Sequence, residues 1–427
     1  MATASFEIED LQEFCAKALT WANQFQAFAY FNSNHFEDIY AKFDTVLAVE
    51  ALTSFTADGH NTFEKIEQFK AGHLNYWIPG FFSYDLKNEI ESLSTTFPNR
   101  LSFPEAFFFV PKYLLTFRGN TINIEAENPT QIFQSISNTA YSPSERLVGK
   151  FKKRMSEEAY HQAFAHMQRH IQLGDIYEVN LCQEFFAEQI NIDPIHTYLR
   201  LNTLSPTPFS VLFKQKDNYI ISATPERFLA KRSDKIISQP IKGTVKRGQN
   251  NQEDLLLKEE LRHNPKEISE NLMIVDLVRN DLTRSAIHGT VKVERQLEVQ
   301  TFQQVHQLVS TVTCQKKQFL SDLQVIKNTF PAGSMTGAPK ISAMELCEKY
   351  ENSRRGIYSG SVGYFAPDGD FDFNVIIRSL LYNQSKGYLS FHTGGAITLA
   401  SNVEKEYAEC LLKAEAILKV FNTTLED

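Results

Sequence analysis

The spacing of apolar and polar residues predicts several amphipathic helices. Residues 156–173 repeat apolar positions with helical spacing, and the pattern stops at Gly174, a residue type that commonly ends helices. Residues 253–284 carry a longer helical pattern, which we expect to break near Pro265 because proline lacks the N–H that a helix interior needs. Two further helices are expected at residues 340–350, entered through Pro339, and at residues 404–420.

Strand patterns fill most of the remaining sequence after residue 200. Residues 219–229 and 235–241 have the residue types of two strands, joined by a turn at residues 232–234. Further strands are expected at residues 361–365, 373–382 and 387–393. Because strands and helices come in blocks and do not alternate strictly, the pattern favours an α+β fold with antiparallel sheets over a doubly wound fold.

The N-terminal third of the chain has a different pattern of predicted elements. It mixes short strand patterns, such as residues 43–49, with aromatic-rich turns, such as residues 77–84. The polar stretch at residues 135–145 resembles a linker, so we expect two regions, residues 1–140 and residues 150–427. The alternative is that the N-terminal part packs back as one face of a single large unit.

Composition and charge disfavour several classes of protein. The net charge is −8 and there is no long basic tract, so a nucleic-acid partner is disfavoured. No stretch approaches the roughly 20 apolar residues of a membrane span, and residues 1–13 lack the apolar run of a secretory signal. The five cysteines are odd in number and well separated, which fits a reducing compartment and excludes the usual zinc spacings. We therefore expect a cytoplasmic protein that binds neither nucleic acid nor membrane.

Two Glu-x-x-Glu pairs are the candidates for a metal site. Glu267 and Glu270 lie in one predicted helix and Glu406 and Glu409 in another, and a spacing of three places both carboxylates of a pair on one helix face. Two such faces brought together make an oxygen-rich, anionic site suited to Mg²⁺. The alternative is a pair of solvated acidic faces. The many polar residues between Glu270 and Arg284 must pair with each other or face a cavity.

Lys242 and Glu226 are candidates for nucleophilic and acid–base chemistry. Lys242 is held by proline and glycine at the end of a predicted strand. A lysine must be neutral to attack, and the neighbouring Lys246 and Arg247, or desolvation, would lower its pKa. Glu226 lies on the preceding predicted strand, so a hairpin would bring it to the same pocket, where it could protonate a leaving oxygen. The alternative is a surface lysine in a turn.

Two glycine-rich segments are candidate anion sites. Residues 333–340 enter a predicted helix, whose N-terminus favours anions, but proline precedes Lys340, so this is not a Walker A loop. Residues 394–395 are glycines that follow a predicted strand and offer backbone N–H groups to a carboxylate. His166 and His170 lie one helical turn apart without a third ligand, so we expect both at the surface.

Taken in order, eight segments resemble the chorismate-utilising enzyme family. They are residues 174–181 (GDIYEVNL), 222–228, 240–244 (PIKGT), 270–281, 330–340, 355–360 (RGIYSG), 377–378 and 401–409. The resemblance covers residues 150–420 strongly and residues 25–95 more weakly. It implies chorismate as substrate and a large two-sheet antiparallel β-sandwich flanked by helices.

The resemblance also implies roles for the matching residues. Glu270 and Glu409 match the Mg²⁺ ligands, and Glu267 and Glu406 would support them or bridge through water. The matches to chorismate contacts are Gly243, Thr244, Tyr358, Arg378 and the backbone of Gly394, Gly395 and Ala396. Arg378 would clamp a carboxylate with its planar fork.

Within the family, Lys242 indicates the branch that aminates chorismate at C4. It matches the lysine nucleophile of that branch, where anthranilate synthases typically have alanine, and Glu226 matches the branch's general acid/base. Gln307 stands where anthranilate synthases typically have a histidine tied to pyruvate elimination, and His306 should point elsewhere. The implied product is 4-amino-4-deoxychorismate, a precursor for para-aminobenzoate and folate.

Ammonia would come from a separate glutaminase subunit, because no cysteine lies in a Gly-x-Cys-x-Gly setting. Two alternatives stay open: an anthranilate-forming enzyme, and a catalytically silent protein that binds tryptophan or chorismate. The resemblance also places a possible tryptophan pocket at Ser33, Tyr40, Ala41, Lys42, Phe43, Pro208, Phe209 and Ser210, with ordinary core packing as the alternative. Three positions depart from the family pattern: Glu178 replaces a common glutamine, Ala396 a glycine and Ala400 an aspartate.

Overall fold

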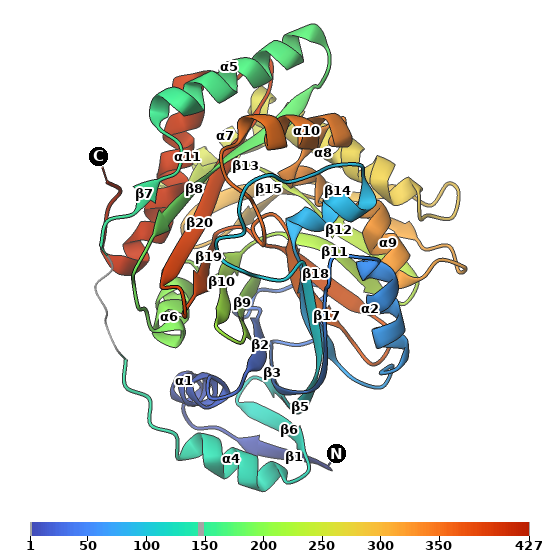
Figure 1. The fold of residues 1–427 in the computed structure, drawn as a ribbon, viewed down its shortest axis with the longest axis vertical. Coiled ribbons are helices and arrows are strands. Elements are labelled where there is room, and N and C mark those ends of the chain that lie inside the picture. The colour runs from blue at the N-terminus through green and yellow to red at the C-terminus, as the bar shows by residue number, and fades with distance from the viewer. Residues whose placement is uncertain (1, 144–148, 427) are drawn as a thin grey trace.

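Antiparallel strand pairing organises the chain, and helices flank the sheet (Figure 1). The computed structural model describes residues 2–143 and 149–426. Within these ranges, hydrogen-bonded pairings connect twenty strands, and every strand pair is antiparallel. This confirms the α+β class and the antiparallel sheet that the sequence predicts.

The elements have the following bounds. The strands are β1 Ala2–Glu7, β2 Ala27–Asn32, β3 Thr45–Thr56, β4 Ile78–Phe82, β5 Ala106–Arg118, β6 Thr121–Ala126, β7 Lys152–Lys153, β8 Glu178–Ala187, β9 Phe209–Gln215, β10 Asn218–Thr224, β11 Arg227–Arg232, β12 Lys235–Gln239, β13 Ile241–Lys246, β14 Lys292–Thr301, β15 Val305–Gln315, β16 Gly337–Ala338, β17 Ser361–Phe365, β18 Phe371–Val375, β19 Ser379–Asn383 and β20 Tyr388–Ile397. The helices are α1 Leu11–Ala22, α2 Thr62–Ala71, α3 Lys87–Ile90, α4 Pro129–Ser137, α5 Glu157–Leu173, α6 Pro194–Leu204, α7 Asn251–His263, α8 Pro265–Thr283, α9 Asp322–Thr329, α10 Lys340–Tyr350 and α11 Val403–Leu418, with short 3-10 turns η1 Tyr84–Leu86, η2 Gly333–Met335 and η3 Lys419–Phe421.

The helix boundaries follow the local sequence signals. Ser156 caps α5 by accepting a hydrogen bond from the Ala159 N–H, and Gly174 ends the helix in the left-handed conformation. The long helical pattern breaks at Asn264, which caps α8 with Pro265 in its first turn. None of the helices in the described part of the chain is long and apolar enough to cross a membrane.

Two predicted strands and one predicted turn need correction. The predicted strand at 219–229 is two strands, β10 and β11, because Pro225 cannot donate to a strand ladder and the chain changes partners there. The predicted strand at 373–382 is likewise β18 and β19, separated by a bend that ends at Arg378. Residues 78–82 of the predicted aromatic turn form strand β4, which pairs with β5 and β17.

Strands from the N-terminal third pair directly with later ones. β2 pairs with β9 and β4 pairs with β17, while β1, β5 and β6 extend the sheet toward the N-terminal end of the molecule (Figure 1). The first residues of the polar stretch at 135–145 close helix α4, and residues 144 and 145 lie outside the described residues.

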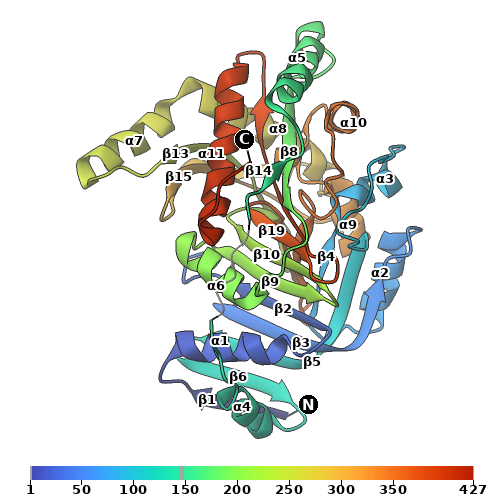
Figure 2. The same ribbon diagram turned by 60° about the vertical axis from the view of Figure 1, so that its left-hand side comes forward.

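Alternate side chains of strand β8 enter the hydrophobic clusters on the two opposite faces of the sheet. Val179 and Leu181 enter one hydrophobic cluster together with residues of α5 and α11. Cys182 enters the second cluster, which is rich in phenylalanine and includes Ile274 and Val278 of α8. Because side chains alternate along a strand, Glu178 lies on the same side of β8 as Cys182. Helix α11 packs against β20, which pairs with β8, and Figure 2 shows α11 beside β8.

Candidate active site

A β-bulge in β13 sets the position of Lys242. Ile241 pairs with Val309 and Thr244 with Gln307, so two residues, Lys242 and Gly243, stand opposite one residue of β15. Gly243 has a φ of +94°, a conformation that favours glycine. The Asn271 amide of α8 donates to the Lys242 carbonyl at 3.3 Å and so ties the bulge to that helix. Bulges of this kind redirect a side chain, here the lysine, away from the regular alternation.

The ammonium group of Lys242 is surrounded by carboxylates. Its Nζ lies 3.1 Å from Oε1 of Glu178, and the two side chains are 12% and 1% exposed. Burial lowers the pKa of Lys242, but the negative charges of Glu178 and Glu270 outweigh burial and raise it. The sequence-based expectation of a lowered pKa is therefore wrong, because it considered neighbouring cations and desolvation but not the carboxylates from β8 and α8.

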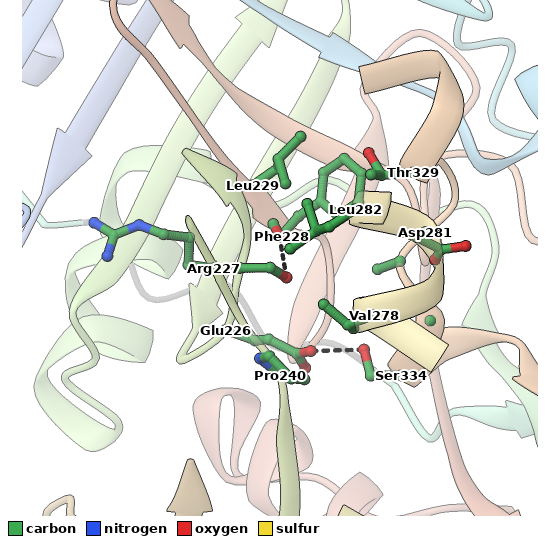
Figure 3. A pocket seen from close by; sticks show the side chains of 13 residues that line it. Glu226, Arg227, Phe228, Leu229, Pro240, Val278, Asp281, Leu282, Thr329 and Ser334 are labelled. Carbon is green, nitrogen blue, oxygen red and sulfur yellow. Dashed lines mark hydrogen bonds between the residues drawn. The ribbon is translucent and has the colours of Figure 1, made fainter. Parts of the chain in front are cut away.

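Glu226 lies in the break between β10 and β11 and points toward Ser334 (Figure 3). The Ser334 hydroxyl donates a hydrogen bond of 2.6 Å to Glu226 Oε1. Burial raises the pKa of Glu226 to about 7, although the Ser334 hydrogen bond and the Lys242 charge oppose the rise. A carboxyl group with such a pKa holds its proton near neutral pH and can still release it, which suits a general acid.

A small cavity beside Glu226 explains its desolvation. Val278 and Leu282 of α8 and Phe228 of β11 supply apolar groups to its wall (Figure 3). Apolar walls disfavour the ionised carboxylate because they offer no hydrogen bonds in place of water. Ser334 was not singled out from the sequence, where it is one residue of a glycine-rich loop.

The four candidate metal ligands come from the first two turns of α8 and α11. Glu270 and Glu406 are buried, Glu267 is half-buried and Glu409 is 45% exposed. Burial raises the pKa of Glu270 to about 7. Desolvation opposes ionisation of Glu409, but the Lys413 ammonium at 2.8 Å outweighs it and lowers the pKa.

Lys266 joins the two Glu-x-x-Glu pairs. Its Nζ lies 3.2 Å from Glu406 Oε1 and 3.6 Å from Glu270 Oε1. Among the residues that the structure describes, no three carboxylate, histidine or cysteine side chains converge tightly enough to hold a metal ion. The chemistry of the set nevertheless fits a hard cation: Glu270 Oε1 is a buried carboxylate oxygen without a hydrogen-bond partner, and the chain's own ammonium group already lies between two of the carboxylates.

The predicted substrate-binding side chains differ in their exposure and in the partners they already contact. Arg378 has a φ of +49°, and its guanidinium has no hydrogen-bond partner among the described residues, so its fork is free to bind a carboxylate. Tyr358 is buried, stacks on His392 with ring centroids 4.7 Å apart, and lies 3.5 Å from Cys182 Sγ through its hydroxyl. Thr244 is exposed and accepts a hydrogen bond of 3.1 Å from the Gln307 amide.

Gly394, Gly395 and Ala396 lie inside β20 and not after a strand, as the sequence-based interpretation had them. The strand continues to Ile397, and all three residues pair with β8. A Cβ at Gly394 would lie 2.2 Å from the Leu181 carbonyl oxygen, and one at Gly395 would lie 3.1 Å from Glu406 Oε2. Close packing explains the glycine at 394, and proximity to a candidate metal ligand explains the one at 395.

Two sequence-based expectations about neighbouring segments have clear outcomes. Lys340 is a structural residue: its Nζ contacts Asp281 at 2.5 Å and the carbonyl groups of Thr329 and Pro331 at 2.9 Å. His306 points away from Gln307, as expected, and contacts Asp254 of α7 at 3.0 Å. Gln307 is buried, and its side-chain amide donates a hydrogen bond to the Thr244 hydroxyl.

The predicted tryptophan pocket corresponds to a cavity on the far side of Arg227. Seven of the eight predicted residues line it: Ser33, Ala41, Lys42, Phe43, Pro208, Phe209 and Ser210. Tyr40 instead contacts Glu294 and Lys235 through its hydroxyl. The sequence did not reveal Asp38, which also lines the cavity and pairs with Arg227 at 2.6 Å.

The chain matches the family of chorismate binding enzymes over residues 15–419. It is 34% identical over 368 residues to aminodeoxychorismate synthase component 1 of Escherichia coli. This match covers 85% of this chain and 80% of that protein. It is 33% identical over 356 residues to anthranilate synthase component 1 of Thermus thermophilus, covering 80% of this chain and 76% of that one.

Solved structures with the same fold include anthranilate synthase component I from Streptococcus pneumoniae. That structure matches with a TM-score of 0.78 at 24% identity, over 90% of this chain and 93% of that one. The menaquinone-specific isochorismate synthase of Escherichia coli matches with a TM-score of 0.78 at 17% identity, over 98% of this chain and 94% of that one. At these identities the likeness concerns the fold alone.

Proposed function

We propose that this chain, which belongs to the family of chorismate binding enzymes, is the aminating component of an aminodeoxychorismate synthase. It would convert chorismate and ammonia to 4-amino-4-deoxychorismate, the precursor of para-aminobenzoate in folate synthesis. The observation that carries the proposal is Lys242, whose side chain is only 12% exposed and projects from the bulge in β13 near Glu226. An enzyme in which ammonia attacked the ring directly would have no use for this nucleophile.

Lys242 would attack the chorismate ring, and the C4 hydroxyl would leave as water. A hydroxyl group leaves readily only when it is protonated, and Glu226 holds a proton near neutral pH because it is buried. Ammonia would then attack C4, and the lysine would leave as an amine. Dividing one difficult displacement into two easier ones is the general benefit of a covalent intermediate.

Mg²⁺ would be held by Glu270 and Glu409, with Glu267 and Glu406 as supporting carboxylates. When bound, this ion would neutralise and orient a substrate carboxylate. Arg378 would bind a carboxylate with its free guanidinium, and Gly243, Thr244, Tyr358 and the backbone of residues 394–396 would shape the rest of the chorismate site. Lys266 must move or share its carboxylates when the metal enters.

Gln307 supports C4 amination over anthranilate formation. Elimination of pyruvate requires a group that moves a proton, and a glutamine amide does not exchange protons near neutral pH. His306 is turned toward Asp254 and cannot replace it. The enolpyruvyl group should therefore stay on the product.

Ammonia would reach the chain from a separate glutaminase subunit. The cavity lined by Ser33 and Ser210 would bind tryptophan in a structural role. Cytoplasmic location remains a prediction from composition.

The proposed function is tested by incubating the chain with chorismate and Mg²⁺ without ammonia and measuring the mass of the intact protein. We expect an adduct on Lys242 that disappears when ammonium is added. A protein mass that never changes, together with no aminated product, would contradict the proposal.

A further inference from the structure

The ion pair between Lys242 and Glu178 raises a question that the proposed reaction leaves open. The lysine must be neutral to attack, yet the site favours its ammonium form, because several carboxylates face it and raise its pKa. Glu178 faces it from β8, Glu270 and Glu267 from α8, Glu226 from the break between β10 and β11, and Glu409 from α11. One of these groups, or water, must take the proton before the C–N bond can form.

We propose that Glu178 is the proton acceptor of the Lys242 ammonium group and a further catalytic residue of this site. The inference rests on the proposed function, because it assumes that Lys242 is the nucleophile. Among the described residues, Glu178 is the carboxylate in ion-pair contact with Lys242, with 3.1 Å between Nζ and Oε1. A proton can pass over this distance without an intervening water.

The second oxygen of Glu178 supports an active role over a purely structural one. Oε2 is buried and has no hydrogen-bond partner, although the residue is only 1% exposed. A buried carboxylate that serves only to hold a lysine is normally satisfied on both oxygens, since an unpaired buried acceptor costs free energy. The backbone around Glu178 is fixed, because Tyr177 and Asn180 donate to the Ala338 and Thr336 carbonyl groups. The carboxylate therefore has a fixed place and an acceptor oxygen to spare.

The other carboxylates are committed elsewhere. Glu226 accepts the Ser334 hydrogen bond and must deliver its own proton to the leaving hydroxyl. Glu270 faces Lys266 at 3.6 Å in the candidate metal site. Transfer from Lys242 to Glu178 also leaves the net charge of the buried pair unchanged, since an ammonium and a carboxylate become an amine and a carboxylic acid.

The proton balance closes over one turnover. Lys242 gives a proton to Glu178, its lone pair forms the bond to the ring, and the C4–O bond breaks as Glu226 protonates the departing hydroxyl to give water. Ammonia then forms the C4–N bond, the bond from the ring to Lys242 breaks, and the product leaves as an alkylammonium. Lys242 recovers its proton from Glu178. Glu226 is recharged by the proton that an ammonium ion loses on becoming ammonia, so chorismate and ammonium give the aminated product and water.

The test compares Glu178→Gln with the wild-type chain, measuring kcat/KM for chorismate from pH 6 to 10 at a constant concentration of free ammonia. Without the acceptor we expect a loss of about a hundredfold at pH 7. The loss should shrink as the pH rises, with the logarithm of the ratio of variant to wild-type rate climbing by about one per pH unit, because solvent must now take the proton. Adduct formation on Lys242 without ammonia should slow by the same factor.

Two further variants make the result decisive. Glu184→Gln changes another buried carboxylate of β8, which pairs with Arg154 at 2.9 Å outside this site, and it should keep the wild-type pH profile. Glu178→Asp keeps a carboxylate acceptor but places it farther from Lys242. Its rate should therefore fall while its pH–rate profile keeps the wild-type shape. This variant replaces Glu178→Gln as the test if Glu178→Gln does not fold. A Glu178→Gln profile parallel to that of the wild type at every pH would overturn the role of Glu178. Failure of the wild-type chain to aminate chorismate would instead overturn the proposed function.

Discussion

Lys266 places its ammonium nitrogen 3.2 Å from the Glu406 carboxylate and so connects the first turn of α8 with the first turn of α11. This contact brings the two Glu-x-x-Glu pairs, far apart in the sequence, to one site. It also puts a positive charge of the chain itself where a divalent cation would be attracted. Lys266 and Mg²⁺ should therefore compete for the same carboxylates.

Replacing Lys266 should strengthen metal binding. In Lys266→Gln we expect the affinity for Mg²⁺, measured by titration calorimetry, to rise about two- to fivefold, because the side chain is partly exposed and its charge is screened by water. Lys405→Gln removes an exposed lysine from the first turn of α11 that makes no ion pair among the described residues, and it should change the affinity little. Weaker Mg²⁺ binding in Lys266→Gln would show that the lysine supports the site and does not compete for it.

Removing a candidate metal ligand should abolish amination. Glu270→Ala and Glu409→Ala should each lower kcat/KM by about a hundredfold or more, and excess EDTA should do the same to the unaltered chain. Glu404→Ala, on an exposed position of α11, is the matched control and should keep full activity. Undiminished turnover in EDTA would rule out the metal requirement.

Ser334 should set the pH at which Glu226 stops working as an acid. The Ser334 hydroxyl stabilises the ionised carboxylate, so Ser334→Ala should raise the pKa of Glu226 further above its present value of about 7. Activity that needs the protonated acid is lost as the pH rises through this pKa, so the alkaline limb of the pH–rate profile should move upward by about one pH unit.

The control for this shift is Ser238→Ala. The Ser238 hydroxyl lies in the same cavity but donates to the Phe228 carbonyl at 2.8 Å, so its loss should leave the alkaline limb in place. A downward shift in Ser334→Ala, or an equal shift in both variants, would show that Ser334 does not tune Glu226.

Ammonium salts should support turnover by the chain alone, whereas glutamine should not. The described cysteines are all free, and those at 182, 314, 347 and 410 are buried, which suits structural thiols better than a glutaminase nucleophile. The measurement is amination with each nitrogen source, before and after adding a glutaminase subunit. Glutamine-dependent turnover by the pure chain would contradict the assignment of a separate partner.

The parts of the fold that the sequence predicted well are those with local signals. Gly174 ends α5 and Pro265 separates α7 from α8, because glycine and proline act on the backbone through their own covalent structure. The breaks near Pro225 and Arg378 were missed, since apolar residues lie on both sides of each break and the change of partner strand leaves no local signal.

The candidate site was predictable in its residue types but not in its contacts. Lys242, Glu226 and the four glutamates could be singled out from their motifs. The approach of Glu178 to Lys242 could not, because it depends on β8 and β13 reaching the same site through a bulge that no local pattern reveals. The negative charge of Glu178 is also why the pKa of Lys242 is raised and not lowered, as we expected from its sequence neighbours.

The fate of the enolpyruvyl group distinguishes C4 amination from anthranilate formation. Wild-type chain and Lys242→Ala would be incubated with chorismate, ammonium and Mg²⁺, and pyruvate and aminated products would be quantified together. We expect 4-amino-4-deoxychorismate without pyruvate from the wild type, and a rate lower by about two orders of magnitude in Lys242→Ala. Pyruvate released in equal amounts with anthranilate would contradict this expectation.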